Sequence, residues 1–216
     1  MNTRLTAYDI INTVPEYRGV VGLSYDSHGW VDGCPEWTDM INRLQPKHVA
    51  EVGVWLGMTT RYICGFPCVE DITCVDHWDA QALDKNSIDI AQQPANRTFT
   101  MYEQFLTNCY HAEIWKKVYP VRMTSVEGAK YCAALGLTFD MIWIDADHST
   151  KGVKEDIAAW MPLLAPDSLM CGDDWGWQTE PYSVRNAVIE SAAKFGMKVT
   201  GIGNFWWYTK QEGQNI

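Results

Sequence analysis

The fold is decided by the stretch His48-Val49-Ala50-Glu51-Val52-Gly53-Val54-Trp55-Leu56-Gly57-Met58-Thr59-Thr60. It opens with an apolar run typical of a buried β-strand, passes a carboxylate at Glu51 and glycines at Gly53 and Gly57, and leads into helical spacing over residues 61–66. This order predicts a strand, a tight glycine turn and a helix N-terminus, where backbone N–H groups can approach a nucleotide-like ligand closely. The alternative is a glycine turn that only joins a buried strand to a helix.

The spacing of the two glycines narrows the class of ligand. It is G-x-x-x-G, whereas dinucleotide-binding turns have G-x-G-x-x-G. A carboxylate at Glu51, just before the first glycine, suits a ligand with a cationic amino group better than a pyrophosphate. An NAD-dependent dehydrogenase is therefore disfavoured.

Composition sets limits on the class of protein. A chain of 216 residues fits one α/β domain over residues 1–216. The net charge of −10 argues against a nucleic-acid partner, which would need clustered Lys and Arg. The seven cysteines form no C-x-x-C pair, so they are interpreted as reduced thiols. With no signal pattern and no apolar run of about 18 residues, we expect a cytoplasmic protein without a membrane partner.

Hydrophobic periodicity predicts alternating strands and helices. After the opening unit we expect strands at Asp71–Asp76, 118–123, 139–145, 168–174, 198–202 and Phe205–Lys210. We expect helices at Ala7–Thr13, Pro35–Leu44, 99–118, 126–135 with Ser125 as cap, 149–164 stopped by Pro166, and 182–195. This pattern predicts a doubly wound α/β fold, with a mainly parallel seven-stranded sheet and a C-terminal antiparallel hairpin. Residues 1–34 would be an N-terminal extension, and 79–117 an insertion that could act as a lid.

Acidic residues stand where the predicted strands end. Ligands of such sheets bind outside the carboxyl ends of the strands. Asp76 ends strand two and can accept hydrogen bonds from both ribose hydroxyls of an adenosine ligand, although an aspartate there is also a common turn former.

Three further acids and a histidine form a second group. Strands four and five should be neighbours about 4.8 Å apart, which would bring Asp145 close to Asp173 and Asp174. Such carboxylates repel one another unless a cation is bound, and oxygen ligands select a hard divalent ion such as Mg²⁺ or Ca²⁺. His148, three residues beyond Asp145, could take a proton from a substrate hydroxyl. The alternative is that Asp145 caps a helix, the aspartate pair is solvated and His148 is a surface residue.

Tryptophans follow two of the predicted strands. Trp78, Trp175 and Trp177 lie just past strand ends and could stack on a sugar or another ring. The alternative is a structural role, which we expect for Trp206 and Trp207 in the last strand.

The sequence resembles a known family in these motifs. The resemblance is to class I S-adenosylmethionine-dependent methyltransferases, and among them to the metal-dependent O-methyltransferases of the macrocin and mycinamicin sugar branch and the cephalosporin-hydroxylase-like proteins. It covers roughly residues 35–210. It is carried by Glu51-Val-Gly-Val-Trp-Leu-Gly57, Asp76, Phe139-Asp-Met-Ile-Trp-Ile-Asp-Ala-Asp-His148 and Gly172-Asp-Asp174.

The resemblance implies a Rossmann-like methyltransferase fold and a role for each site residue. Contacts to S-adenosylmethionine would be Glu51, Gly53 and Gly57 at the methionine end, Asp76 at the ribose, Ser125 near the adenine, and Asp145. The Mg²⁺ ligands would be Asp145, Asp173 and Asp174, with His148 as the general base. The catechol and caffeoyl-CoA enzymes usually carry Lys near the base position and Asn where Asp174 stands, which favours a sugar or another aliphatic hydroxyl as acceptor.

The expected function is therefore metal-assisted transfer of a methyl group from S-adenosylmethionine to a hydroxyl of a small molecule. Two alternatives stay open: a metal-independent N-methyltransferase, and a catalytically silent protein that only binds S-adenosylmethionine. A homodimer is also left open.

Overall fold

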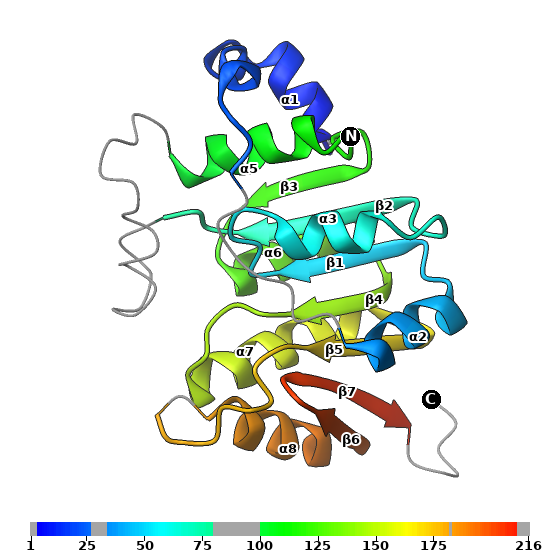
Figure 1. Cartoon of the computed structure of the whole chain (residues 1–216). Coiled ribbons are helices and arrows are strands. Elements are labelled where there is room, and N and C mark those ends of the chain that lie inside the picture. Colours follow the sequence, from blue (N-terminus) through cyan, green and yellow to red (C-terminus); the bar gives the residue numbers. More distant parts are fainter. Residues whose placement is uncertain (1–3, 27–33, 80–99, 182, 211–216) are drawn as a thin grey trace.

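The computed structural model describes residues 4–26, 34–79, 100–181 and 183–210, and these residues form one seven-stranded sheet. Its strand order is β3-β2-β1-β4-β5-β7-β6 (Figure 1). The strands are β1 (His48–Val52), β2 (Asp71–Asp76), β3 (Val118–Arg122), β4 (Phe139–Ile144), β5 (Leu164–Gly172), β6 (Met197–Ile202) and β7 (Phe205–Lys210). Strands β1 to β5 pair in parallel, and β7 pairs antiparallel with both β5 and β6. The predicted mainly parallel sheet with an antiparallel hairpin is confirmed.

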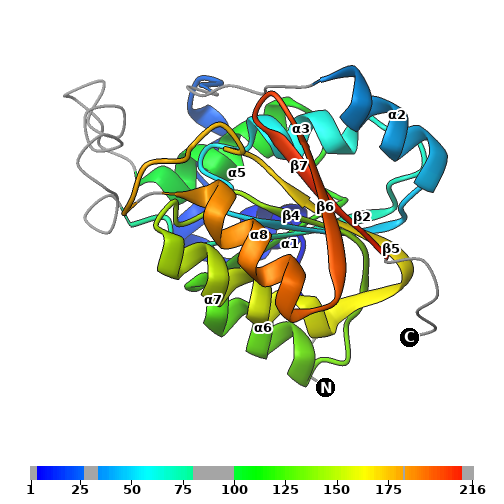
Figure 2. The same cartoon turned by 90° about the horizontal axis from the view of Figure 1, so that it is seen from below.

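Helices cover both faces of the sheet, as a doubly wound fold requires. Figure 2 shows α2 (Pro35–Leu44), α3 (Met58–Cys64) and α5 (Met101–His111) on one face, and α6 (Ser125–Ala134), α7 (Thr150–Trp160) and α8 (Val184–Lys194) on the other. Helix α1 (Ala7–Thr13) contacts α5 and β3. In the part of the chain that the structure describes, no helix is long and apolar enough to cross a bilayer.

Two predicted helix ends are wrong, for different reasons. Helix α7 ends at Trp160 rather than at residue 164, because the 3₁₀ turn Met161–Leu163 follows and Leu164 already pairs with β4; Pro166 therefore lies inside β5. Helix α5 ends at His111, because Glu113 adopts a left-handed φ of 59° and turns the chain toward β3. Residues 80–99, which belong to the predicted insertion 79–117, lie outside the described residues.

The cap of α6 is also corrected. Thr124, not Ser125, precedes the helix, and its hydroxyl lies 2.7 Å from a carboxylate oxygen of Glu127. This leaves the Ser125 side chain available for a contact inside the fold, described below.

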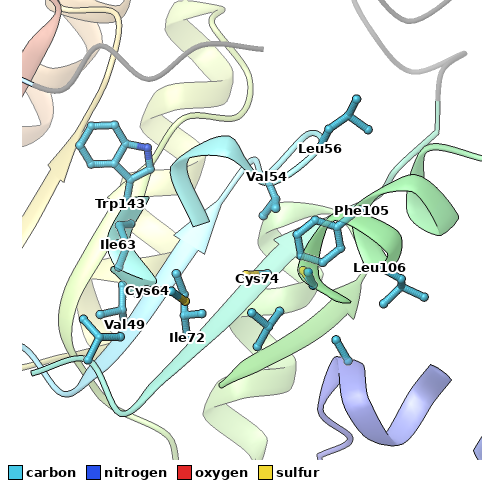
Figure 3. Close-up of a cluster of buried hydrophobic side chains, with 14 of the residues drawn as sticks. Val49, Val54, Leu56, Ile63, Cys64, Ile72, Cys74, Phe105, Leu106 and Trp143 are labelled. Carbon is cyan, nitrogen blue, oxygen red and sulfur yellow. The ribbon is translucent and has the colours of Figure 1, made fainter. Parts of the chain in front are cut away.

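One hydrophobic cluster fixes the first β-α units. Figure 3 shows the side chains of β1 and β2 meeting those of α3 and α5 between sheet and helices. Ile63 of α3 and Phe105 of α5 are fully buried there. Because both helices pack on β1 and β2, the turn after β1 is held between them.

A stack of aromatic rings joins distant parts of the chain. Trp37 of α2 stacks on Trp143 of β4 with ring centroids 4.2 Å apart. Phe205 of β7 stacks on Trp143 at 5.9 Å, and Trp207 on Phe205 at 5.1 Å. The hairpin is thereby packed against α2, on the same face of the sheet as α3.

The turn after β1 needs a glycine at its first position. Gly53 has a φ of 82°, and a Cβ built there would lie 1.9 Å from the carbonyl oxygen of Asp145. That oxygen belongs to the backbone and cannot rotate away. Gly53 therefore allows the end of β1 to approach the chain that leaves β4.

We predict that Gly53→Ala destabilises the protein far more than Gly136→Ala. Gly136 has a similar φ of 70°, but a Cβ there would meet nothing within 4 Å, so it isolates the cost of the left-handed backbone. That cost is about 1–2 kcal/mol. The clash with Asp145 should add roughly 1–3 kcal/mol or prevent folding altogether. Urea unfolding of both variants measures the difference, and equal losses would contradict the steric argument.

Candidate functional site

The sheet has its topological switch point between β1 and β4. From β1 the chain continues to β2 and β3 on one side, and β4 then lies on the other side of β1. The carboxyl ends of three strands are joined there, since the Gly53 N–H donates to Val75 at 2.9 Å and the Asp145 N–H donates to Val52 at 2.7 Å. In open α/β sheets this crevice is where ligands bind.

Three candidate residues come together at this edge. His148 Nε2 lies 3.0 Å from Asp174 Oδ2 and 3.8 Å from Asp145 Oδ1. One ligand atom from each of the three residues lies within 4.8 Å of the others, close enough to hold one metal ion. All three side chains are half-buried. We call this set the Asp-His-Asp cluster.

The pairing of β4 with β5 creates the cluster. Ile144 is in register with Gly172, and a Cβ on Gly172 would lie 2.2 Å from the Ile144 carbonyl oxygen, so the two strand ends are very close. The Asp173 N–H donates to that same carbonyl at 3.2 Å. Asp174 then adopts a φ of 62°, a left-handed conformation that aspartate tolerates better than most residues. The convergence expected from adjacent strands is thus present.

Asp173 lies beside the cluster rather than in it. Its Oδ1 accepts the backbone N–H of Asp174 at 2.8 Å. The group that can share one ion in the described chain consists of Asp145, His148 and Asp174. The expectation that Asp173 is a metal ligand stays a prediction.

The loop that carries His148 is fixed by hydrogen bonds of its neighbours. Asp147 Oδ1 accepts the Ser149 N–H at 2.7 Å, and Ser149 Oγ accepts the Gly152 N–H at 3.0 Å. Ser149 is the N-cap of α7. Asp147 therefore has a structural task at the start of the helix.

Asp76 organises the glycine turn. Its Oδ2 accepts the backbone N–H groups of Val54 at 2.9 Å and Trp55 at 3.0 Å, and its Oδ1 accepts that of Trp78 at 2.7 Å. The common turn-forming role considered for this aspartate is present. A carboxylate has about four acceptor positions, so the ribose contact remains compatible with these bonds and stays a prediction.

Glu51 lies inside the fold, next to the turn. Its side chain is 1% exposed and accepts the Thr60 hydroxyl of α3 at 2.6 Å. Burial raises the pKa of Glu51 well above its ordinary value of 4.5, and the negative charges of Asp145 and Asp76 raise it further. Gly57 directly precedes α3 with a φ of 85°. Their contacts with the methionine end of a cofactor stay predictions.

Ser125 is tied to a buried carboxylate that the sequence analysis missed. Its Oγ accepts the Trp160 indole N–H at 3.0 Å, and its hydroxyl and the Asp147 backbone hydrogen-bond to Asp156. Asp156 is 4% exposed, and among the described residues its Oδ2 has no partner. Helical spacing between Val153 and Trp160 places residue 156 on the buried face of α7, and this signal could have found it. The adenine contact of Ser125 stays a prediction.

The three tryptophans have different surroundings. Trp78 is buried, stacks on Phe105 and donates its indole N–H to the Trp55 carbonyl at 2.7 Å. Trp175 packs against Gly201 and beneath the Arg185 guanidinium. Only Trp177, among these three, is exposed, and its ring centroid lies 4.6 Å from that of His148.

The sequence itself identifies the family of this domain. Residues 50–175, more than half of the chain, match the family described as "Methyltransferase domain". The chain belongs to this family of methyltransferase domains. It is also 20% identical over 193 residues to the uncharacterised protein y4gI of Sinorhizobium fredii. That match covers 85% of this chain and 20% of y4gI, so the chain spans about one fifth of this relative.

Solved structures share the fold. An O-methyltransferase from Bacillus cereus, in complex with SAH, has a TM-score of 0.57 at 14% identity, with 93% of this chain and 94% of that chain covered. The mycinamycin-pathway methyltransferase MycE, in complex with Mg and SAH, has a TM-score of 0.53 at 15% identity over 81% of this chain and 49% of its own. The Rossmann-like methyltransferase fold that the resemblance implied is therefore confirmed.

Asp156 gives a prediction on stability against pH. Burial raises the pKa of this carboxyl from 3.8 to about 6 in the folded protein. Ionisation therefore costs the folded state more than the unfolded state, and wild-type stability should fall as the pH rises from about 4 to above 6. Asp156→Asn lacks this titration, so its stability relative to wild type should rise by about 2–3 kcal/mol between pH 4 and pH 8, from 1.36 kcal/mol for each pKa unit.

Urea unfolding of wild type and Asp156→Asn at several pH values measures this difference. Glu155→Gln is a matched control, because Glu155 is exposed on the solvent side of the same helix. A pH-independent difference between wild type and Asp156→Asn would show that burial does not disfavour the charge.

Proposed function

We propose that this chain transfers a methyl group from S-adenosylmethionine to a hydroxyl of a small molecule, with the help of a divalent cation. The observation that carries the proposal is the Asp-His-Asp cluster, which lies at the switch point of a methyltransferase-family domain beside the glycine turn. A histidine and two carboxylates lie there next to the expected cofactor crevice. Activation of a hydroxyl requires a group that accepts its proton and, in metal-assisted transfer, carboxylates that hold the cation.

The cofactor would bind along the ends of β1, β2 and β4. We assign its contacts to the six residues expected from the sequence: Glu51, Gly53, Gly57, Asp76, Ser125 and Asp145. The positive end of α3 and the backbone of the glycine turn face this edge of the sheet. Support comes from the Bacillus cereus neighbour, which has the same fold and is in complex with SAH.

The Asp-His-Asp cluster fits a divalent cation. Its two carboxylates, Asp145 and Asp174, would hold a cation such as Mg²⁺ or Mn²⁺ together with Asp173, and His148 lies beside the ion as the base rather than as a ligand. Support comes from MycE, which is in complex with Mg. When bound, the cation would lower the pKa of the acceptor hydroxyl and fix the position of its oxygen.

His148 would act as the general base. It takes the hydroxyl proton on Nε2 while the oxygen forms a bond to the methyl carbon and the bond from that carbon to the sulfonium sulfur breaks. The electron pair of the broken bond stays on sulfur, which leaves S-adenosylhomocysteine. The proton then lies on a nitrogen 3.0 Å from Asp174 Oδ2, whose negative charge stabilises the imidazolium.

The ribose assignment of Asp76 gives a prediction on cofactor binding. Asp76→Ala should weaken S-adenosylhomocysteine binding by about 1–3 kcal/mol, the range of hydrogen bonds to charged groups. Because Asp76 also fixes the glycine turn, the same variant should be titrated with an analogue that lacks the ribose hydroxyls. Calorimetry should show a smaller loss for that analogue. Equal losses for both ligands would mean that Asp76 acts only through the turn.

The role of His148 gives a prediction on methyl transfer. Wild type should transfer labelled methyl groups to members of a hydroxyl panel, EDTA should abolish transfer, and Mg²⁺ or Mn²⁺ should restore it. His148→Ala should lower turnover by roughly 10²–10⁴ and leave S-adenosylhomocysteine binding unchanged. His48→Ala is the control, since His48 begins β1 at the opposite edge of the sheet and pairs with Asp71.

Each alternative function has its own result in this experiment. Transfer to amines that persists in EDTA would indicate a metal-independent N-methyltransferase. Cofactor binding without transfer to either panel would indicate a silent binding protein. Near-normal turnover of His148→Ala on a weakly acidic alcohol would exclude His148 as the base.

A further inference from the structure

The glycine turn after β1 has an unfavourable backbone conformation beyond what its glycines explain. Gly53 and Gly57 adopt left-handed φ values of 82° and 85°, and Trp55 between them adopts one of 53°. For a residue with a bulky side chain this region is unfavourable, so the conformation persists only where surrounding contacts hold it. The residues that hold the turn therefore decide whether it keeps the form in which a cofactor can bind.

Side chains from β2, from the chain just after β2 and from α5 hold this turn. Asp76 accepts two of its N–H groups, and the Trp78 indole donates to one of its carbonyls. From α5, Asn108 Nδ2 donates to the Leu56 carbonyl at 2.8 Å. Leu56 directly precedes Gly57, so this bond fixes the turn where it enters α3.

The same amide group of Asn108 also holds the backbone of Asp26. Nδ2 donates to the Asp26 carbonyl at 2.6 Å, and Oδ1 accepts the Asp26 N–H at 2.9 Å and Gln104 Nε2 at 3.0 Å. A primary amide has two N–H donors and two acceptor lone pairs, so the hydrogen-bonding capacity of Asn108 is fully used. Asn108 is 3% exposed, so water does not replace a partner that is lost. One buried side chain thus joins the glycine turn to the N-terminal part of the chain.

Residues 20–26, which we call the strap, cross α5 and contact it (Figure 1). Polar side chains at helical spacing on α5 bind the backbone of the strap: Gln104, Thr107, Asn108 and His111. Thr107 Oγ1, for example, donates to the Val20 carbonyl at 2.9 Å. Arg61 of α3 donates from Nη1 to the Tyr25 hydroxyl at 3.0 Å. The strap therefore bridges the two helices between which the glycine turn is held.

We propose that Asn108 is a positioning residue of the cofactor site, and that it couples the strap to the glycine turn. With the strap bound, the amide group holds the Leu56 carbonyl, and the turn keeps the form that receives the methionine end of S-adenosylmethionine. When the strap is released, the amide group loses its bonds to Asp26 and can rotate away from Leu56. Such coupling is reciprocal, so the cofactor in turn holds the strap in place. This inference rests on the proposed function, from which it takes the cofactor.

Calorimetry with two ligands separates this role from a general loss of structure. S-adenosylhomocysteine carries the amino-acid part that would bind at the turn, and 5′-methylthioadenosine lacks it. Asn108→Ala should weaken S-adenosylhomocysteine by about 10-fold and 5′-methylthioadenosine by less than about 2-fold. Thr107→Val is the matched control, because it removes the bond to Val20 from the same buried stretch of α5 and leaves the contact with Leu56 intact. It should bind both ligands as wild type does. Equal losses of both ligands in Asn108→Ala, or no loss of either, would overturn the proposal.

Hydrogen exchange of the wild-type protein tests the coupling even if Asn108→Ala does not fold. Saturating S-adenosylhomocysteine should slow exchange of the Asp26 amide by at least about 5-fold, because release of the strap then also weakens cofactor binding. The Gly196 amide, bonded to Ala193 at the end of α8, is the control and should exchange as before. An Asp26 amide that exchanges equally fast with and without the ligand would exclude the coupling. Coupling as expected, without methyl transfer to any hydroxyl, would count against the proposed function alone.

Discussion

The contact between the backbone of Gly53 and the carbonyl of Asp145 is the constraint on which the site depends. It brings the ends of β1 and β4 together at the point where the strand order reverses. Residues that follow β1 and β2 then border one side of the crevice, and those that follow β4 and β5 border the other. A methyl donor and an acceptor bound on the two sides would be within reach of one another, and proximity of this kind supplies much of the rate in group transfer.

The sheet could be predicted because its buried strands appear in the sequence as short apolar runs. The bounds of β2, Asp71–Asp76, are those expected, and so are those of β7, Phe205–Lys210. The boundary between α7 and β5 could not be predicted in this way. There the apolar spacing continues through Leu164, and only the pairing of that residue with β4 decides that it belongs to a strand. Tertiary contacts override periodicity where helix and strand patterns overlap.

The site could be predicted to the level of which strand ends meet. Asp145, His148 and Asp174 were expected together because parallel neighbours end at one edge, and the structure brings them together. The partners of the other acids depend on side-chain direction, which strand order does not contain. Examples are the Thr60 hydroxyl, which donates to Glu51, and the backbone N–H groups that donate to Asp76. The same limit explains why three tryptophans near strand ends looked alike in the sequence.

The aromatic stack has a consequence for the order in which the protein can be completed during synthesis. Trp37 and Trp143 are almost fully buried, but the ring that covers Trp143 from β7 is Phe205, made some 60 residues after it. A ribosome adds about 5–20 residues per second, so both indoles lack the contact with Phe205 for several seconds. During this interval the β5 edge is also unpaired, since β7 is its partner. Until the hairpin emerges, this unpaired edge leaves the nascent chain open to aggregation.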